Sequence, residues 1–487
     1  MTVTADFTGS GTSTRAFYAA YYVFDITDPE QDPVLLWTLT DASLGLTTSV
    51  PAVVRVSPTA DAKTDNTNAK WVALLGTGPT SYIGASTQAS QFIAVNLATG
   101  PDYIISHPAT GSLHSVSCSG SQKCDKAVLN TAISGNSPAF STGDSNSFMG
   151  DVISLDANLD YRGDAIYAGN VITNSSSPPT YIGKMYRLAT GAISGTHPET
   201  FSNWGVLSGT TRVPTVLLAT FACTPTPCTG TTKVGPITAG STVTSDDTNN
   251  FWVYFGTGRF FAQTDKGNTD AQYFFGVKDP VANTTSCIET STTSCQRNDL
   301  LDVSNVTVCV VGVGSCTTST QVAGLAGGST SFSGSGTSLQ GLVLSKQGWF
   351  MTFPIAGERS LSNPTILGGT VFFTTFIPIN DFCIASGSGN LYALFYLTGS
   401  AYQQSSIGTT GVGGGTVAKY ISLGTGLPSQ MAVQIGAQGT GTSGASSSTG
   451  CAGRVTGFIQ ASTGVLGSLC GTPALSVWSR LISWRDL

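Results

Sequence analysis

The segment from residue 156 to residue 164 places oxygen-bearing side chains at alternate positions. It reads DANLDYRGD, so that Asp156, Asn158, Asp160 and Asp164 offer carboxylate or amide oxygens, and the main-chain carbonyl of Arg162 lies among them. A hard cation such as Ca²⁺ takes about six to eight oxygen ligands, which a compact loop supplies from alternate residues. The spacing therefore predicts a calcium-binding loop with these five residues as ligands.

Two features of this loop lower the calcium affinity that we expect. Its sixth position is Tyr161, where such loops favour glycine, and a non-glycine residue in a left-handed turn costs about 1 kcal/mol. Asn158 also replaces a possible carboxylate, so the expected dissociation constant is on the order of 10⁻⁴ to 10⁻³ M, as in extracellular modules. The alternative is a polar turn without an ion, because Asp and Asn stabilise turns through their own hydrogen bonds.

The end of the same loop, Arg162, Gly163 and Asp164, is an Arg-Gly-Asp tripeptide. In a recognition loop the aspartate reaches a metal of the partner and the arginine reaches a carboxylate of the partner. If Asp164 closes a calcium loop, its oxygens turn inward and the tripeptide is a coincidence. Because a three-residue match is weak evidence, calcium binding is the stronger prediction.

The sequence offers little for catalysis. Its three histidines, His107, His114 and His197, lie in predicted loops without a nucleophile motif, and GxSxG, HExxH, P-loop and CxxCH patterns are absent. Glu358 and Arg359 read as an ion pair or an exposed turn rather than as a catalytic acid with its partner. We therefore predict no catalytic residues and no enzyme.

Composition points to strands joined by many turns. Charged residues make up 10% of the chain and hydrophobic residues 40%, and 58 residues are glycine. The net charge of -6 and the lack of a Lys/Arg cluster argue against nucleic acid and anionic membranes as partners. No apolar window is long enough to predict a membrane span. The start, MTVTADFTGS, does not read as a signal peptide, so we expect either a mature chain or a missing upstream part.

The 11 cysteines are mostly close neighbours in segments rich in Ser, Thr, Gly and Pro. They are Cys118 and Cys124, Cys223 and Cys228, Cys287 and Cys295, Cys309 and Cys316, then Cys383, Cys451 and Cys470. This spacing is typical of local disulfides in an oxidising compartment and predicts an exported protein. It lacks the paired knuckles of a zinc site. Since the number is odd, one thiol stays reduced or bonds outside this chain.

Short apolar runs that end in glycine turns recur along the chain. WVALLGTG at 71–78 and FWVYFGTG at 251–258 represent one kind, and FIAVNLATG at 92–100 and LYALFYLTG at 391–399 another. A third kind begins with a proline at or near the first strand residue. This repetition predicts an all-β fold, a β-propeller of about seven blades. We expect a single domain over 1–487, with insertions at about 104–148, 281–340 and 400–450.

Six segments along the chain form an ordered series: YYVFDITDP, KWVALLGTG, FWVYFGTGRFF, QYFFGVKDP, GWFMTFPIAGERSLSNPTILGGTVFFTTFIP and SRLISWRDL. In this order they resemble signatures of the C-terminal propeller of the PilY family of type IV pilus tip-associated proteins. The resemblance runs from about residue 17 to residue 487, and its most specific part is 348–378. It implies an exported propeller at the pilus tip or cell surface, with the family's calcium loop at 156–164, just before the strand AIYAGN.

The resemblance also implies a function in pilus assembly and attachment with minor pilins. The chain matches only the propeller half of the family, so an adhesive N-terminal half is expected to be a separate chain or to be lost. The attachment surface would be abiotic or a host. One alternative is a free-standing surface adhesin that binds a receptor or a glycan through its long loops. Another, a quinone-dependent dehydrogenase, lacks the adjacent cysteine pair and the regular tryptophan repeat of that class.

Overall fold

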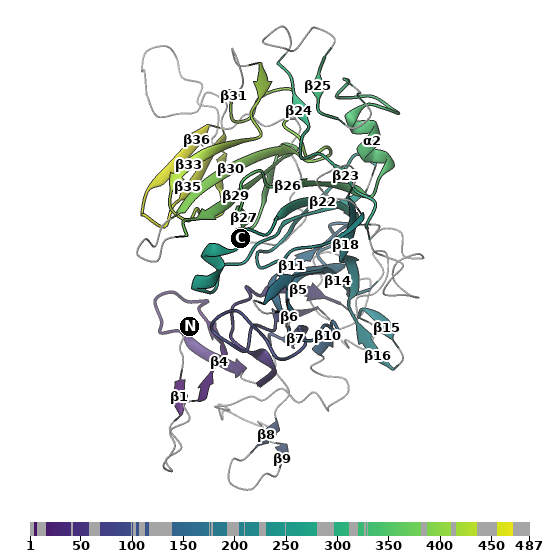
Figure 1. Ribbon diagram of the computed structural model, residues 1–487. Coiled ribbons are helices and arrows are strands. Elements are labelled where there is room, and N and C mark those ends of the chain that lie inside the picture. The colour runs from purple at the N-terminus through teal and green to yellow at the C-terminus, as the bar shows by residue number, and fades with distance from the viewer. Residues whose placement is uncertain are drawn as a thin grey trace. The chain divides into compact units, whose positions relative to one another are not determined.

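In the computed structural model, β strands are the main regular elements of the described residues (Figure 1). The described residues are 21–57, 69–100, 139–191, 204–223, 230–279, 297–310, 320–325, 328–380, 387–435 and 455–470, with short gaps inside these ranges, and the strands Thr4–Asp6, Ala16–Tyr18, Ile104–Ser106 and Leu113–Ser115. The prediction of an all-β fold is confirmed. In the described part, no helix is long and apolar enough to cross a membrane.

The chain forms two compact units, of which the first consists chiefly of Met1–Leu217. Its two larger sheets have the strand orders β10-β7-β6-β5 and β11-β12-β14-β17, and β13 also pairs with β12. Their strands are β5 (Ala52–Val56), β6 (Lys70–Gly76), β7 (Gln91–Asn96), β10 (Ala139–Ser141), β11 (Ser147–Leu155), β12 (Ala165–Asn174), β13 (Thr180–Ile182), β14 (Met185–Ala189) and β17 (Thr215–Leu218).

Smaller pairs complete the described part of the first unit. One of them, the β3–β4 ribbon, joins β3 (Tyr21–Asp25) to β4 (Val34–Leu39). The others are β1 (Thr4–Asp6) with β2 (Ala16–Tyr18), β8 (Ile104–Ser106) with β9 (Leu113–Ser115), and β15 (Val206–Ser208) with β16 (Thr211–Val213). A short 3₁₀ helix, η1 (Ala42–Leu44), follows the ribbon.

The second unit consists of Leu218–Pro280 and Gln296–Leu481. Its larger sheets have the orders β20-β21-β22-β26-β23, β27-β29-β30-β33 with β28 beside β29, and β34-β35-β36. Their strands are β20 (Thr242–Ser245), β21 (Phe251–Gly256), β22 (Tyr273–Asp279), β23 (Leu301–Asp302), β26 (Gly348–Thr352), β27 (Arg359–Ser360), β28 (Thr365–Leu367), β29 (Thr370–Pro378), β30 (Gly387–Phe395), β33 (Tyr420–Thr425), β34 (Ala432–Ile435), β35 (Val455–Gln460) and β36 (Leu466–Cys470).

Short elements also occur in this second unit. They are the strand pairs β18 (Thr220–Cys223) with β19 (Gly230–Lys233), β24 (Thr307–Val308) with β25 (Val322–Ala323), and β31 (Thr409–Thr410) with β32 (Thr416–Val417), and the helices η3 (Gln263–Gly267) and α2 (Leu339–Ser345). Parts of all three predicted insertions thus carry strands, and each insertion also contains residues outside the described part. The prediction of a single domain over 1–487 stays a prediction.

Local sequence explains where many strands begin and end. Pro51, Pro214 and Pro364 each stand directly before a strand, where a missing N–H costs little, as predicted. In two of the repeated Thr-Gly turns the glycines Gly100 and Gly399 adopt φ values of 72° and 64°. A side chain is strained in this left-handed region, so glycine suits these turns.

The core of the first unit is aliphatic and aromatic. It gathers buried side chains from β5, β6, β7, β11, β12 and β14 around Trp204, which is fully buried. A second cluster lies beneath the β3–β4 ribbon, where Trp37 and Leu39 meet Leu75, Ile93 and Val95. These buried faces hold β11 and β12 in place, and those two strands carry the predicted loop between them.

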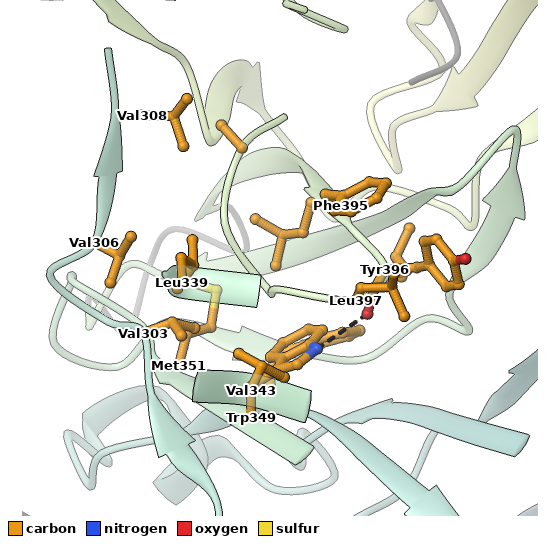
Figure 2. Close-up of a cluster of buried hydrophobic side chains, with 14 of the residues drawn as sticks. Val303, Val306, Val308, Leu339, Val343, Trp349, Met351, Phe395, Tyr396 and Leu397 are labelled. Atoms are coloured by element: carbon orange, nitrogen blue, oxygen red, sulfur yellow. Dashed lines mark hydrogen bonds between the residues drawn. The ribbon is translucent and has the colours of Figure 1, made fainter. Parts of the chain in front are cut away.

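The core of the second unit is richer in aromatic rings and centres on Trp349 of β26. Figure 2 shows its indole Nε1 donating a hydrogen bond to the carbonyl oxygen of Tyr396, at 3.0 Å. Gly276, its cross-strand partner on β22, leaves room for the ring, because a Cβ there would lie 2.4 Å from Trp349 Cε2. Phe274 and Phe373 stack at 3.7 Å between ring centroids and join the two neighbouring sheets.

Candidate functional site

The segment 156–164 connects β11 to β12 as the loop of an antiparallel hairpin. Leu155 and Ala165 are cross-strand partners, so the nine residues between them close the hairpin. The main-chain N–H of Asp164 donates to the carbonyl oxygen of Leu155 at 2.7 Å. The position of the loop just before the strand AIYAGN is therefore as predicted.

The carboxylate of Asp156 organises the first half of the loop. It is almost fully buried and accepts hydrogen bonds from the main-chain N–H groups of Asp160 at 3.1 Å and Tyr161 at 2.7 Å. The backbone winds tightly around it, with φ values of 57° at Leu159 and 66° at Tyr161. The left-handed turn predicted at Tyr161 is thus present. Burial is the largest influence on Asp156 and raises the pKa of its carboxyl.

The carboxylate of Asp164 closes the loop from the other end. Its Oδ2 accepts a hydrogen bond from the main-chain N–H of Ala157 at 2.6 Å, and the side chain is buried. Burial raises the pKa of this carboxyl to about 7; the bond from Ala157 lowers it, while the charges of Asp156 and Asp160 raise it. The loop therefore concentrates negative charge.

Asp160 faces its own neighbours. Its Oδ2 pairs with Arg162 Nη2 at 2.6 Å and accepts a bond from Asn158 Nδ2 at 3.0 Å, and its Oδ1 accepts the main-chain N–H of Arg162 at 2.9 Å. These donated bonds and the guanidinium charge outweigh burial, so that the pKa of Asp160 is lowered. The arginine side chain thus holds this carboxylate in the arrangement that the structure shows.

The donor set suits a hard cation in its chemistry, since it consists of carboxylate, amide and carbonyl oxygens. Among the described residues, however, no group of three or more His, Cys, Asp or Glu side chains is arranged to hold a metal ion. Asp160 would have to leave Arg162 before all three loop carboxylates turned to one ion. Calcium binding by Asp156, Asn158, Asp160, the Arg162 carbonyl and Asp164 therefore stays a prediction.

The Arg-Gly-Asp tripeptide lies against the protein. Arg162 and Asp164 have exposed fractions of only 8% and 2%. The N–H of Gly163 donates to the carbonyl oxygen of Arg55 at 2.9 Å, and a Cβ at this glycine would lie 2.4 Å from Val54 Cγ1. Such burial does not favour recognition of the tripeptide by a partner.

The prediction of an ion pair or exposed turn at Glu358 and Arg359 is wrong. Both side chains are buried, with exposed fractions of 1% and 3%. The guanidinium of Arg359 donates to the carbonyl oxygens of Gly357, Arg259, Asp265 and Asn268 at 2.9 to 3.0 Å. The fold brings these carbonyl oxygens together around the guanidinium, so they are its acceptors in place of the neighbouring Glu358 carboxylate that the sequence suggested.

Sequence reasoning also missed two polar clusters, the first partly buried and the second fully buried. In the first unit, Asp144 accepts bonds from Asn170 Nδ2, Lys184 Nζ and the Tyr186 hydroxyl, although it lies in a predicted insertion. In the second unit, Glu358 is surrounded by polar side chains of β29 and β30. Polar residues inside otherwise apolar strands are the signal that would have found this second cluster.

The remaining predicted residues are only partly covered by the structure. His107 and His197 lie outside the described residues, and only the backbone is described at His114 in β9. Cys309 is disulfide-bonded, and it is the one cysteine whose side chain belongs to the described part. The pairing of the cysteines stays a prediction.

Short strands grouped in successive sheets define the fold as one of the β-propeller class, which confirms the predicted fold class. It is similar to the crystal structure of the Pseudomonas aeruginosa PilY1 C-terminal domain, with a TM-score of 0.55 and 15% sequence identity, over 97% of this chain and 84% of that domain. The blade number stays a prediction.

A sequence relative is also described by the name PilY1. Over 173 residues, or 34% of the chain, the sequence is 28% identical to a Xylella fastidiosa protein described as a type IV pilus biogenesis factor PilY1 homolog. That match spans 10% of the relative's length. No protein-family model matches the chain. The two similarities confirm the resemblance to the PilY family that the sequence motifs indicated.

Proposed function

We propose that this chain is a non-catalytic component of a type IV pilus and acts in pilus biogenesis at the pilus tip or cell surface. The observation that carries the proposal is its similarity to the Xylella relative, which is described as a pilus biogenesis factor. The similarity of the fold to the PilY1 C-terminal domain supports it. Surface attachment would follow from the assembled pilus.

Deletion of the gene in the organism that encodes this chain tests the proposal. Sheared surface pili would be quantified by immunoblot and electron microscopy, together with total pilin in the cells. We expect surface pili to be lost while total pilin persists, and the intact gene to restore them. Normal pili in the deletion strain would contradict the proposal and favour the free-standing adhesin, which would still bind a receptor or glycan.

We also propose that the 156–164 loop binds Ca²⁺ when Asp160 exchanges Arg162 for the ion. Hard oxygen donors, two buried carboxylates and the concentration of negative charge support this ligand set. The bound ion would neutralise that charge and fix the hairpin end of β11 and β12. The proposed role of calcium is therefore to order one end of this sheet.

Calorimetric titration of Ca²⁺ into chelator-treated protein tests this role. We expect one ion to bind with a dissociation constant on the order of 10⁻⁴ to 10⁻³ M. Asp160→Ala should weaken binding about tenfold or more, since it removes the loop carboxylate that is most accessible. Asp28→Ala, an exposed aspartate in the β3–β4 turn, is the matched control and should bind like wild type. Equal binding by both variants, or none by wild type, would contradict the assignment.

Minor pilins are the proposed partners, and the β3–β4 ribbon is their proposed contact. Its outer face exposes Tyr22, Phe24 and Leu36 by 40%, 49% and 52%, although Trp37 and Leu39 on the same ribbon are buried. The segment 25–33, which comprises the last residue of β3 and the turn, carries four acidic residues and no basic one. This surface fits an extended pilin segment with alternate apolar side chains and flanking basic residues, added as a further strand.

Co-purification with individual minor pilins tests this contact. Phe24→Ser with Leu36→Ser should reduce pilin capture, and 0.5 M salt should weaken it because the acidic turn contributes. Tyr82→Ser, at an exposed aromatic residue outside the ribbon, is the matched control. Undiminished capture by the ribbon variant would place the pilin contact elsewhere and leave the biogenesis proposal intact.

A further inference from the structure

A row of polar side chains crosses three strands inside the second unit. Ser360 of β27 is the cross-strand partner of Thr375 of β29, which is in turn the partner of Asn390 of β30. Cross-strand partners project from the same face of a sheet. All three are buried, with exposed fractions of 1%, 1% and 4%. Polar side chains in such a place need partners other than water.

The carboxylate of Glu358 lies over this row. Its Oε1 accepts three hydrogen bonds, from Thr375 Oγ1 at 2.6 Å, Asn390 Nδ2 at 2.9 Å and the Tyr392 hydroxyl at 2.9 Å. All three donors are neutral. They satisfy one oxygen of the carboxylate but bring no positive charge to it.

The other oxygen, Glu358 Oε2, is buried and has no hydrogen-bond partner among the described residues. Ser360 Oγ, two residues further along the chain, is also buried without a hydrogen-bond partner among the described residues. The guanidinium of the adjacent Arg359 donates its hydrogen bonds to main-chain carbonyl oxygens. A bound cation would supply the positive charge that the described neighbours of this oxygen do not bring, and burial of a charge without such compensation costs several kcal/mol.

We propose that Glu358 Oε2 binds a monovalent alkali cation, Na⁺ or K⁺, with Ser360 Oγ as a second ligand. Oxygen donors suit hard cations, whereas soft thiolate or imidazole ligands, which select transition metals, take no part in this cluster. A single carboxylate balances a single positive charge, so a divalent ion would leave a net charge buried. The ion would tie the turn before β27 to β29 and β30, and the second unit would be more stable in its presence.

Thermal unfolding in chelator-treated buffer tests this site. Melting temperatures would be compared in NaCl, KCl and choline chloride at matched ionic strength. We expect a rise of about 2 to 5 °C in the preferred alkali salt over choline, at a tenfold excess of ion over its dissociation constant. Identical melting temperatures in all three salts would overturn the proposal.

Two variants separate the site from general salt effects. Glu358→Gln removes the charge at similar volume and should abolish the difference between alkali and choline salts. Asp246→Asn is the matched control, because Asp246 is also buried but both of its oxygens accept hydrogen bonds, from Thr248, Asn250 and Trp252. It should keep the difference, whatever its own stability. A Glu358→Gln protein that kept the difference would contradict the assignment.

A crystal structure of wild type with Rb⁺ or Tl⁺ in place of the lighter ions decides the matter even if Glu358→Gln fails to fold. We expect an anomalous peak within coordination distance of Glu358 Oε2 and Ser360 Oγ. An ordered water only, without anomalous signal, would show that the buried oxygen is hydrated and would overturn the cation site.

Discussion

At the scale of single residues, Arg162 decides the state of the candidate loop. Its guanidinium pairs with Asp160 at 2.6 Å, and both side chains are largely buried. Calcium and this guanidinium would compete for the same carboxylate. The residue thus acts in two opposed ways, because its main-chain carbonyl is a predicted ligand while its side chain excludes the ion.

Arg162→Gln is therefore expected to strengthen calcium binding. The variant keeps the main-chain carbonyl and removes the competing charge. Its dissociation constant for calcium should therefore fall about threefold to tenfold, which corresponds to the free energy of a partly buried ion pair. Calorimetric titration beside wild type measures it, with Arg212→Gln, outside the loop, as the control. Weaker binding by Arg162→Gln would show that the guanidinium helps to build the site.

Lys419 gives stability a dependence on pH in the alkaline range. Its Nζ donates to the carbonyl oxygens of Val303 and Ser304 at 3.2 and 3.0 Å. Burial lowers its pKa to about 8, against the opposing effect of Asp302. In the pH range between about 8 and the ordinary lysine pKa of 10.5, the unfolded chain holds a proton that the folded chain has lost. Stability at this residue therefore rises with pH through that range.

Lys419→Met should remove this dependence. Below pH 8 the variant avoids the free-energy cost of burying a charged lysine. Between pH 8 and pH 10.5 the free energy of unfolding of wild type should rise by about 2 kcal/mol relative to the variant, after allowance for partial exposure. Urea unfolding of both proteins at several pH values from 7.5 to 10.5 gives this difference. Parallel curves for the two proteins would show that the lysine does not titrate in this range.

At the scale of secondary-structure elements, glycines make room where sheets carry large rings. Gly276 on β22 and Gly399 in the turn after β30 both face Trp349, and a Cβ at either would lie within 2.4 Å of the indole. The indole is fully buried and hydrogen-bonded, so it cannot move aside easily. These glycines therefore allow β22 and β26 to pair around the ring.

Gly276→Ala should destabilise the protein by about 2 kcal/mol or more, as overpacking does in a rigid core. Gly267→Ala in η3 is the control, since the nearest atom to a Cβ there would be Nδ2 of the Asn380 side chain, at 3.4 Å. That exposed substitution should change stability by less than about 0.5 kcal/mol. Chemical denaturation of the two variants compares them, and equal stability would show that the indole relaxes.

At the scale of the whole molecule, the two proposed ion sites lie in different compact units. The 156–164 loop belongs to the first unit and Glu358 to the second. Each ion should therefore stabilise mainly the strands that carry its ligands, because local opening reports the contacts of each region separately.

Hydrogen exchange with each ion added in turn tests this separation. Calcium should slow amide exchange in β11 and β12. At a calcium concentration a hundredfold above the dissociation constant, exchange should be about tenfold slower if half of the free energy of binding stabilises these two strands. The preferred alkali ion should slow exchange in β29 and β30. Protection by calcium throughout both units would show instead that the chain opens as one cooperative body.

The sequence by itself determined the strand-rich fold, the turns and the place of the candidate loop. These features depend on neighbouring residues: β-branched runs bounded by glycine, prolines before Ala52 and Thr215, and the Asp and Asn residues of the segment that begins at residue 156. The left-handed backbone at Tyr161 was predictable for the same reason. The propeller itself followed from the repetition of these short-range signals along the chain.

Only the tertiary structure decided what the polar side chains contact. Glu358, Thr375 and Asn390 are far apart in sequence and meet because β27, β29 and β30 pair in one register. Likewise, the predicted partner of Arg359 was its neighbour Glu358, but its guanidinium donates to main-chain carbonyl oxygens about a hundred residues away. Charge and spacing show which groups can form bonds, but the burial that makes each bond necessary arises only when the sheets pack.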